Sequence, residues 1–531
     1  MPTLSTPADQ SPSVRLPRLD LALLALLIVL TLFARALPDA RTIDDAFITF
    51  RYSRNIIAGH GFVYNPDSRV LGTTTPLYTL LMAAIGAVTR GDNFPAYALI
   101  VNALADAGTV VLLYLLMRRV TANRWMGLLI GVLWTIAPRS VTFAIGGMET
   151  SVAILLMTGA VYCLLTDRPI WLGVLAALGI LTRIDVGLLV ALLFAQQAWE
   201  RLQHHARPPW RTWIATLITL APWLIFSTLY FGSPLSRSAS AKTVAYALPA
   251  GSALVSFIQA YSTPFFEFDA FGGRGALIGI FVYVVLAAIG TLYAVRREPR
   301  LLGWLIYPWL YAAAFAIANP LIFRWYLTPP LPPFFFAIVC GAWAIVDTLR
   351  YAGKRTATRN SPPLRSPIYT ILIVPAVLWI GTSLNAWTLH PDHGPDRPAP
   401  LMAWNKIELY YQRIGLELRD KYGVTASTRV ASADIGAIGY FSNATIIDTV
   451  GLVTPALSSY YPIDKALIVE GQNYAIPTAL ILDTQPSYFV TMEAFVRLGL
   501  VPNATFQSDY QLLDEIPTDF YGTGMRLYGR R

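Results

Sequence analysis

Apolar runs of membrane-spanning length recur from residue 20 to residue 386, and they constrain the fold more than any other feature of this chain. A helix that crosses a bilayer needs about 20 mostly apolar residues, and fewer where other helices bury it. Of the 531 residues, 55% are hydrophobic and 13% are charged, which excludes an ordinary soluble domain. We therefore predict an α-helical polytopic membrane protein. Eleven runs qualify as spans, near residues 20–37, 95–117, 125–138, 149–166, 170–182, 184–199, 212–231, 276–294, 301–318, 327–348 and 367–386.

Short basic clusters lie between these runs and predict their orientation, because basic loops stay on the cytoplasmic side. All the clusters fall on one face if the short apolar segment 76–89 does not cross, so we expect that segment to be half-inserted or to lie at the surface. The N-terminus is then cytoplasmic in a multi-pass protein of the cytoplasmic membrane. Since orientation accounts for the net charge of +9, no nucleic-acid partner is expected. The clusters are Arg15 with Arg18, 118–124, 201–211, 296–300 and 350–359.

The composition divides the chain into three parts. A polar tail at 1–19 precedes an uncleaved first span, and a membrane domain with a first external loop at 38–94 occupies 20–386. Residues 387–531 have ordinary soluble composition and are expected outside the membrane. There, "TRVASADIGAIGYFSNATIIDTVGL" is typical of strand, small-residue helix and strand, and "PSYFVTM" of another buried strand, which predicts a small α/β domain. The Pro-rich "PDHGPDRPAP" is the expected linker.

Two adjacent acids, Asp44 and Asp45, open the stretch "DDAFITFRYSRNII" directly after the first span. A helix over 44–57 would align Asp44, Arg51 and Asn55 on one stripe and would lie along the membrane surface. Two interpretations stay open at this point. The acids cap the helix while the arginines meet lipid phosphates, or one acid is a general base and the other binds a cation or a hydroxyl.

Other charges interrupt apolar sequence on the same predicted outer side. They are Glu149 in "GGMETS", Arg183 and Asp185 in "LTRIDVG", and Arg324 before "WYLTPPLPP". Charges at such depths are costly unless they are paired or face a watery cavity, so they are functional candidates. The structural alternatives are a helix-terminal acid, a self-neutralising pair and a headgroup anchor. An arginine here could also bind a lipid-linked phosphate, whose oxygens match the guanidinium fork.

Several common site motifs are absent from the sequence. There is no G-x-x-x-x-G-K-[ST] phosphate loop and no G-x-S-x-G nucleophile turn, and the five histidines lack the spacing of a zinc site. Both cysteines, Cys163 and Cys340, lie in apolar segments. An ATP-driven pump and redox chemistry are therefore not expected.

The first-loop block "DDAFITFRYSRNIIAGHGFVYNP", with "GTTTPLYTLL", "GGMETS", "LTRIDVG" and "DTVGL", resembles the GT-C superfamily of polyprenyl-phosphate-sugar-dependent glycosyltransferases. More closely, it is similar to the branch of bacterial terminal arabinofuranosyltransferases. The likeness is strongest from residue 41 to 190. It implies a GT-C membrane domain, a polyprenyl-phosphate sugar donor, and a glycan, lipid or protein acceptor outside the membrane.

The resemblance also implies roles for individual residues. The position that matches the superfamily's catalytic base is Asp44, with Asp45 the second acid of the pair. Arg324 and Arg183 are then expected at the donor phosphate, with Arg51 as a third cation, and Asp185 completes the substrate-binding set. Glu149 would help Asp45 orient the acceptor or hold a divalent Mg or Mn ion, if one is used; no other cofactor is expected.

Two other classes of function fit parts of the sequence. A lipid or oligosaccharide transporter would use the outer polar residues as a binding site, but transporters commonly show internal repeats, and none is evident here. A sensor domain on a passive anchor would leave eleven spans and the acid pair unexplained. The prediction is therefore a hexosyl- or pentosyltransferase of GT-C type.

Overall fold

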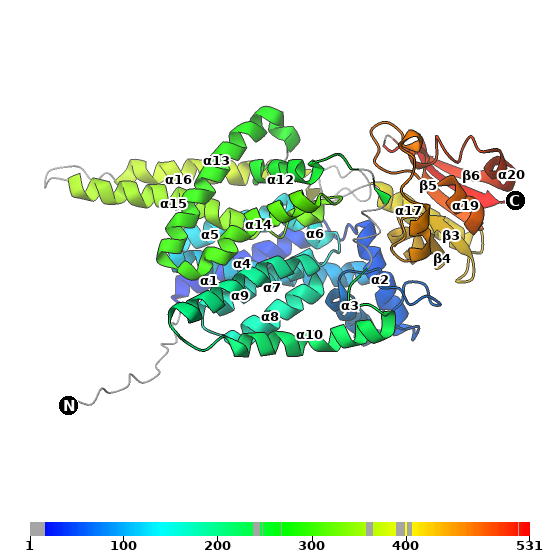
Figure 1. The fold of residues 1–531 in the computed structure, drawn as a ribbon. Helices are drawn as coiled ribbons and strands as arrows, with labels where there is room; N and C mark the ends of the chain where they lie inside the picture. Colours follow the sequence, from blue (N-terminus) through cyan, green and yellow to red (C-terminus); the bar gives the residue numbers. More distant parts are fainter. Residues whose placement is uncertain are drawn as a thin grey trace.

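The computed structural model describes residues 16–236, 245–246, 248–266, 268–356, 365–388, 399–400, 406–518 and 520–531. Most of the predicted tail and most of the predicted linker lie outside these residues. A bundle of long helices makes up the larger part of the molecule, and the C-terminal domain packs at one end of it, beside α2 and α3 (Figure 1).

The helical part comprises fifteen α-helices in the described residues. They are α1 (Arg18–Ala36), α2 (Asp44–Ile57), α3 (Pro76–Thr89), α4 (Phe94–Thr121), α5 (Arg124–Ile136), α6 (Pro138–Ile145), α7 (Thr150–Leu165), α8 (Pro169–Thr182), α9 (Gly187–Gln203), α10 (Trp210–Phe231), α12 (Ser252–Ser262), α13 (Phe268–Arg297), α14 (Leu302–Ala318), α15 (Leu331–Thr356) and α16 (Arg365–Asn385). Short 3-10 turns η1 (Ile184–Val186), η2 (Pro299–Leu301) and η3 (Arg324–Leu327) connect some of them.

Six helical segments of the described chain are long and apolar enough to cross a membrane, or seven if the bent pair α5 and α6 forms one span. Four shorter apolar helices accompany them, one of which is α3, the segment predicted not to cross. The polytopic helical class is confirmed, while the number of eleven spans stays a prediction.

Ion pairs at one end of the bundle join segments that carry the predicted basic clusters. Arg118 of α4 contacts Asp20 of α1 at 3.2 Å, and Arg119 contacts Glu298 at 2.7 Å. Arg300 contacts Asp167 at 2.8 Å. These contacts bring clusters from three parts of the sequence to one end, as the orientation argument requires.

The bend between α5 and α6 brings the segment that carries Glu149 close to the one that carries Asp44 and Asp45. Pro138 lacks an amide hydrogen, so the helical bonding is interrupted there and the two axes differ by 50°. Arg35 of α1, fully buried, donates to the carbonyl oxygen of Thr135 at the broken end and to Asp106 Oδ2 at 2.9 Å. The chain that leaves α6 then pairs with the segment before α2, where the amide of Ile43 donates to Gly146 O at 3.0 Å. The starts of α2 and α7 are therefore adjacent.

The C-terminal domain is built on a five-stranded sheet with the order β4-β3-β5-β7-β6. β3 pairs in parallel with β4 and β5, and β7 pairs antiparallel with β5 and β6. Its elements are α17 (Lys406–Asp420), β3 (Arg429–Ser432), α18 (Gly436–Ser442), β4 (Thr445–Asp448), α19 (Thr478–Thr484), β5 (Tyr488–Met492), α20 (Ala504–Asp509), β6 (Tyr510–Pro517) and β7 (Gly524–Arg530). Shorter elements are β1 (Trp387–Thr388), β2 (Ala399–Pro400), η5 (Pro455–Tyr460), η6 (Lys465–Leu467) and η7 (Glu493–Phe495). The predicted succession of strand, helix and strand and the strand in "PSYFVTM" are confirmed.

The loop predicted at 38–94 and the C-terminal domain share one hydrophobic core. Phe47 and Phe50 of α2 are buried in the same cluster as Ile438 of α18 and Ile446 of β4. The Phe47 ring lies 5.2 Å from that of Tyr440. Apolar side chains from two distant parts of the sequence thus leave water together, which packs α2 against the C-terminal domain.

Candidate functional site

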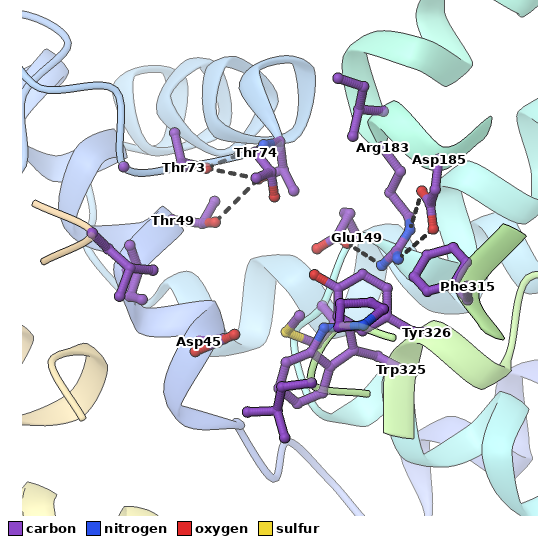
Figure 2. A pocket seen from close by; sticks show the side chains of 18 of the residues that line it. Asp45, Thr49, Thr73, Thr74, Glu149, Arg183, Asp185, Phe315, Trp325 and Tyr326 are labelled. Atoms are coloured by element: carbon purple, nitrogen blue, oxygen red, sulfur yellow. Dashed lines mark hydrogen bonds and ion pairs between the residues drawn. The ribbon is translucent and has the colours of Figure 1, made fainter. Parts of the chain in front are cut away.

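A cavity of about 370 Å³ lies where α2, the membrane helices and the C-terminal domain meet (Figure 2). Its charged side chains are Asp45, Glu149, Arg183 and Asp185. Its other lining residues are Ile48, Thr49, Gly72, Thr73, Thr74, Thr75, Met148, Ile184, Phe315, Ala318, Pro320, Leu321, Trp325, Tyr326 and Leu452. Four of the seven candidates named from the sequence therefore face one cavity, although they come from three separate segments of the chain.

The two adjacent acids of α2 face different surroundings. Asp45 lines the cavity and is partly exposed. Asp44 is buried against α18, where its Oδ2 accepts from the amide of Gly436 at 2.9 Å and its Oδ1 from the amide of Ala437 at 2.7 Å. Since one helical step turns a side chain by about 100°, consecutive residues cannot share a face. The helix predicted over 44–57 is confirmed, and Asp44 lies on the side that packs on the C-terminal domain.

Burial is the main influence on the Asp44 carboxyl. It raises the pKa of Asp44 to about 8, with smaller contributions from the charges of Asp434 and Asp45. The two amide donors of α18 act in the opposite direction. The loss of water therefore favours the neutral carboxyl of Asp44, whereas the donated hydrogen bonds favour its carboxylate form.

A buried ion network crosses the other side of the cavity. Arg183 donates from Nη1 to Glu149 Oε1 at 2.8 Å, and from Nε and Nη2 to the two carboxylate oxygens of Asp185 at 3.0 and 2.8 Å. The Tyr311 hydroxyl donates to Asp185 Oδ2 at 2.5 Å, and the guanidinium lies 5.0 Å from the Tyr326 ring centre. Arg183 and Asp185 thus pair, as the self-neutralising alternative predicted, and also line the cavity.

Glu149 does not act as a conventional helix cap. It occupies the N-cap position of α7, but its side chain makes no capping hydrogen bond and binds Arg183 instead. Figure 2 shows Glu149 pointing toward Arg183 and Asp185. The Glu149 side chain is therefore part of the cavity wall and does not cap α7.

Threonines form a hydroxyl-bearing wall next to Asp45, which the sequence analysis did not identify as part of a site. Thr49 Oγ1 lies 3.3 Å from Thr75 Oγ1, which lies 3.1 Å from Thr73 Oγ1. Thr74 is the exposed member of the group. The run "GTTTP" belongs to a block quoted for the family resemblance, but its uncharged side chains were assigned no role.

Trp325 and Tyr326 face the cavity from the side of η3 (Figure 2), and the Trp325 ring stacks on that of Phe323 at 4.6 Å. Phe315, Ala318 and Leu321 add an apolar surface beside them. The cavity therefore combines one acid-and-hydroxyl wall, one ion-pair network around Arg183 and one apolar wall.

Two predicted cations do not line this cavity. The guanidinium of Arg51 is buried and donates to the carbonyl oxygens of Tyr64 at 2.9 Å and Gly439 at 2.6 Å, and its contact with a donor phosphate stays a prediction. Arg324 is exposed at the start of η3 and is absent from the lining, although Trp325 and Tyr326 next to it are present. Arg51 turns away because the α2 face that carries it also carries Asp44, seven residues earlier.

A metal ion has little support from the arrangement of the acids. In the part of the chain that the structure describes, no group of three or more His, Cys, Asp or Glu side chains is placed to hold one. Glu149, one of the two residues suggested for a divalent ion, is already bonded to Arg183.

The fold and the cavity together define a membrane protein with the GT-C fold. A crystal structure of ArnT from Cupriavidus metallidurans bound to undecaprenyl phosphate is similar at 12% identity and a TM-score of 0.56, and covers 96% of this chain and 97% of that chain. The apo ArnT structure gives 13% identity, the same coverage and a TM-score of 0.55. The S. cerevisiae protein O-mannosyltransferase Pmt1–Pmt2 complex bound to its sugar donor matches 45% of this chain and 39% of its own, at 15% identity and a TM-score of 0.32, too low to support an argument.

Sequence comparisons add one match. Residues 403–528 match the family described as Domain of unknown function (DUF8728), which corresponds to the C-terminal domain. No curated protein sequence matches the chain. The structural similarity therefore establishes the fold, and the site residues of this chain carry the functional argument.

Proposed function

We propose that this protein is a membrane glycosyltransferase that transfers a sugar from a polyprenyl-phosphate donor to an acceptor outside the cytoplasmic membrane. The observation that carries the proposal is one cavity in which a carboxylate, Asp45, lies opposite a guanidinium, Arg183, beside an apolar wall. The similarity to an ArnT structure that holds undecaprenyl phosphate supports the choice of donor. The sugar is a hexose or a pentose, the latter in keeping with the resemblance to terminal arabinofuranosyltransferases.

Asp45 is the proposed general base. The acceptor hydroxyl oxygen attacks the anomeric carbon while Asp45 removes its proton, and the bond between that carbon and the phosphate oxygen breaks, leaving the electron pair on the phosphate. The sequence analysis assigned this step to Asp44. We assign it to Asp45 because both oxygens of Asp44 accept backbone hydrogen bonds from α18 and only Asp45 lines the cavity.

Arg183 is the proposed ligand of the departing phosphate. A guanidinium carries five N–H groups, and three of them donate to Glu149 and Asp185. Among the described contacts, two N–H groups are left for a phosphate oxygen. The acids hold the guanidinium in place, which stabilises the charge that develops on the leaving group without further rearrangement.

The apolar wall suits the lipid part of the donor. Phe315, Ala318 and Leu321 line the cavity near Arg183, and Ile184, beside Arg183 in sequence, is 57% exposed. A phosphate at Arg183 would let the polyprenyl chain leave along this side, toward the bilayer. The sugar would then lie between Arg183 and the wall formed by Asp45 and the threonines.

The test compares Asp45→Asn with Asp44→Asn in membranes of a strain that lacks the native protein. Mass spectrometry of the deletion strain first identifies the accumulated polyprenyl-phosphate sugar and the truncated glycan. Asp45→Asn is expected to lower transfer about 10²- to 10⁴-fold, the range for loss of a general base, while binding of undecaprenyl phosphate is retained. Full transfer by a folded Asp45→Asn variant would reject the proposed base.

A further inference from the structure

The helix that carries Asp45 has a second face, whose side chains contact the C-terminal domain as well as Tyr64 and Asn65 of the loop that follows the helix. On the cavity side are Asp45, Ile48 and Thr49. On the other side, Asp44 and Arg51 bond to α18 or to the residues directly after it. The surroundings of α2 on both faces are therefore defined residue by residue.

Asp44 supplies the N-terminal cap that α18 does not make for itself. The N-cap residue of α18, Ile435, has an apolar side chain and makes no capping hydrogen bond. The first amides of a helix have no partner within the helix, and here Gly436 and Ala437 donate theirs to Asp44. The carboxyl group of Asp44 thus satisfies the first amides of a helix that lies 392 residues later in the chain.

Arginines of α2 satisfy the other end of α18. Arg51 donates to the carbonyl oxygens of Gly439 and Ala444, the latter at 2.5 Å, and Arg54 donates to that of Tyr440 at 2.9 Å. A helix leaves its last carbonyls without partners inside the helix, so these bonds supply the hydrogen-bond donors that the C-terminal end of α18 lacks. Asp44 at the amide end of α18, with Arg51 and Arg54 at its carbonyl end, fixes both the direction and the register of α2 along α18.

Close approach of the two helices depends on glycines in α18. A Cβ atom at Gly436 would overlap the backbone oxygen of Asp44, and one at Gly439 would overlap the Tyr64 hydroxyl. That hydroxyl donates to Ile435 O at 2.5 Å. The backbone of α2 therefore lies directly against the start of α18, with no side chain between them to absorb a shift.

The first external loop extends this interface to the sheet. The Asn65 side chain accepts from the amide of Ile446 at 3.0 Å and donates to its carbonyl oxygen at 2.8 Å. Ile446 belongs to β4, the edge strand of the sheet. Contacts at both ends of α18 and at β4 hold α2 as one body with the C-terminal domain.

From these contacts we infer a function for the C-terminal domain: it positions α2 so that Asp45 faces the cavity, with Asp44, Arg51 and Gly436 as positioning residues. The inference rests on the proposed function of Asp45 and deepens it. A domain that instead served only to bind the acceptor would not need to satisfy both ends of α18 with side chains of the catalytic helix.

The experiment uses Gly436→Ala and Asp44→Asn in the full-length protein, with Gly499→Ala as the control. Gly499 lies in the C-terminal domain, where an added Cβ meets only Thr478 Oγ1, at 3.1 Å. We measure turnover, the KM for the truncated acceptor glycan, binding of undecaprenyl phosphate, and hydrogen exchange of the amides of residues 44–57. Both interface variants are expected to lower turnover at least 10-fold and to speed exchange in α2, with KM and undecaprenyl phosphate binding within 2-fold of the unmodified protein.

The outcomes separate this inference from the proposed function. A raised KM for the acceptor with unchanged turnover would assign acceptor binding to the domain and overturn the inference, as would unchanged turnover and exchange in both variants. If the unmodified protein transfers no sugar but both variants still speed exchange in α2, the interface holds α2 as inferred and the glycosyltransferase proposal fails. Asp44→Asn keeps the size of the side chain and carries the test if Gly436→Ala does not fold.

Discussion

Replacing Arg51 by lysine should destabilise the protein although the charge is kept. The guanidinium donates to four acceptors, namely Tyr64 O, Gly439 O, Ala444 O and Asn65 Oδ1 at 3.2 Å, and lies 4.3 Å from the Tyr64 ring centre. A lysine ammonium is a compact group that cannot reach acceptors on opposite sides, so at least two lose their partner. At about 1.5 kcal/mol for each charged hydrogen bond and about 1 kcal/mol for the ring contact, the loss is roughly 4 kcal/mol.

The assay is thermal unfolding of the purified full-length protein in detergent, followed by intrinsic fluorescence. For a domain the size of the C-terminal one, a loss of this size lowers the melting temperature on the order of 10 °C. Arg54→Lys on the same helix is the matched control, because the half-buried Arg54 makes one carbonyl bond, to Tyr440, and one ring contact, 4.4 Å from the Tyr440 ring centre. A lysine ammonium can keep a single carbonyl bond, so the loss should be about 1 kcal/mol, that of the ring contact. Equal melting temperatures for the two variants would refute the assignment of Arg51 to the interface.

Two further predictions concern charges. Arg183→Gln removes the partner of Glu149 and Asp185, so we expect thermal unfolding to show a loss of about 3–5 kcal/mol in stability. Ligand titration should show much weaker binding of undecaprenyl phosphate, and undiminished binding would exclude Arg183 as the phosphate ligand. Burial, followed by the charge of Asp434, raises the pKa of Asp44 from 3.8 to about 8, so the folded state holds this proton more strongly than the unfolded state does. The contribution of the protonated Asp44 to stability is complete below pH 3.8 and is lost as the pH rises through 8. The melting temperature of the unmodified protein should therefore drop between pH 6 and 9 more than that of Asp44→Asn, and parallel pH curves for the two would contradict this.

Local patterns in the sequence were enough to predict many of the elements of this fold. Apolar length gave the membrane helices, and the helix over 44–57 and the strands around "DIGAIGYFS" follow from periodicities that each segment carries in itself. β6 and β7 were not predicted. β6 is an edge strand in which only Tyr510 and Ile516 are buried, so its polar residues resemble a loop.

Most of the predicted site residues line one cavity, but the sequence was less informative about the role of each residue. Asp45, Glu149, Arg183 and Asp185 were singled out because charge in apolar sequence is costly, and that argument does not depend on the fold. The proposed choice of Asp45 over Asp44 does depend on it, because it rests on amides of α18 almost four hundred residues away. The place of Arg51 could not be predicted for the same reason, since most of its partners are backbone oxygens, which leave no pattern in the side chains.

The distance along the chain between Asp44 and Gly436 also has a consequence for synthesis. Their hydrogen bond joins positions 392 residues apart, so α2 leaves the ribosome long before α18 exists. At about 5–20 residues per second, the delay is roughly 20–80 s. During that time Asp44 and Arg51 have none of their α18 partners, so α2 is not yet fixed against the C-terminal domain. Under the proposed function, the nascent chain would thus acquire activity only after the C-terminal domain has been translated and folded.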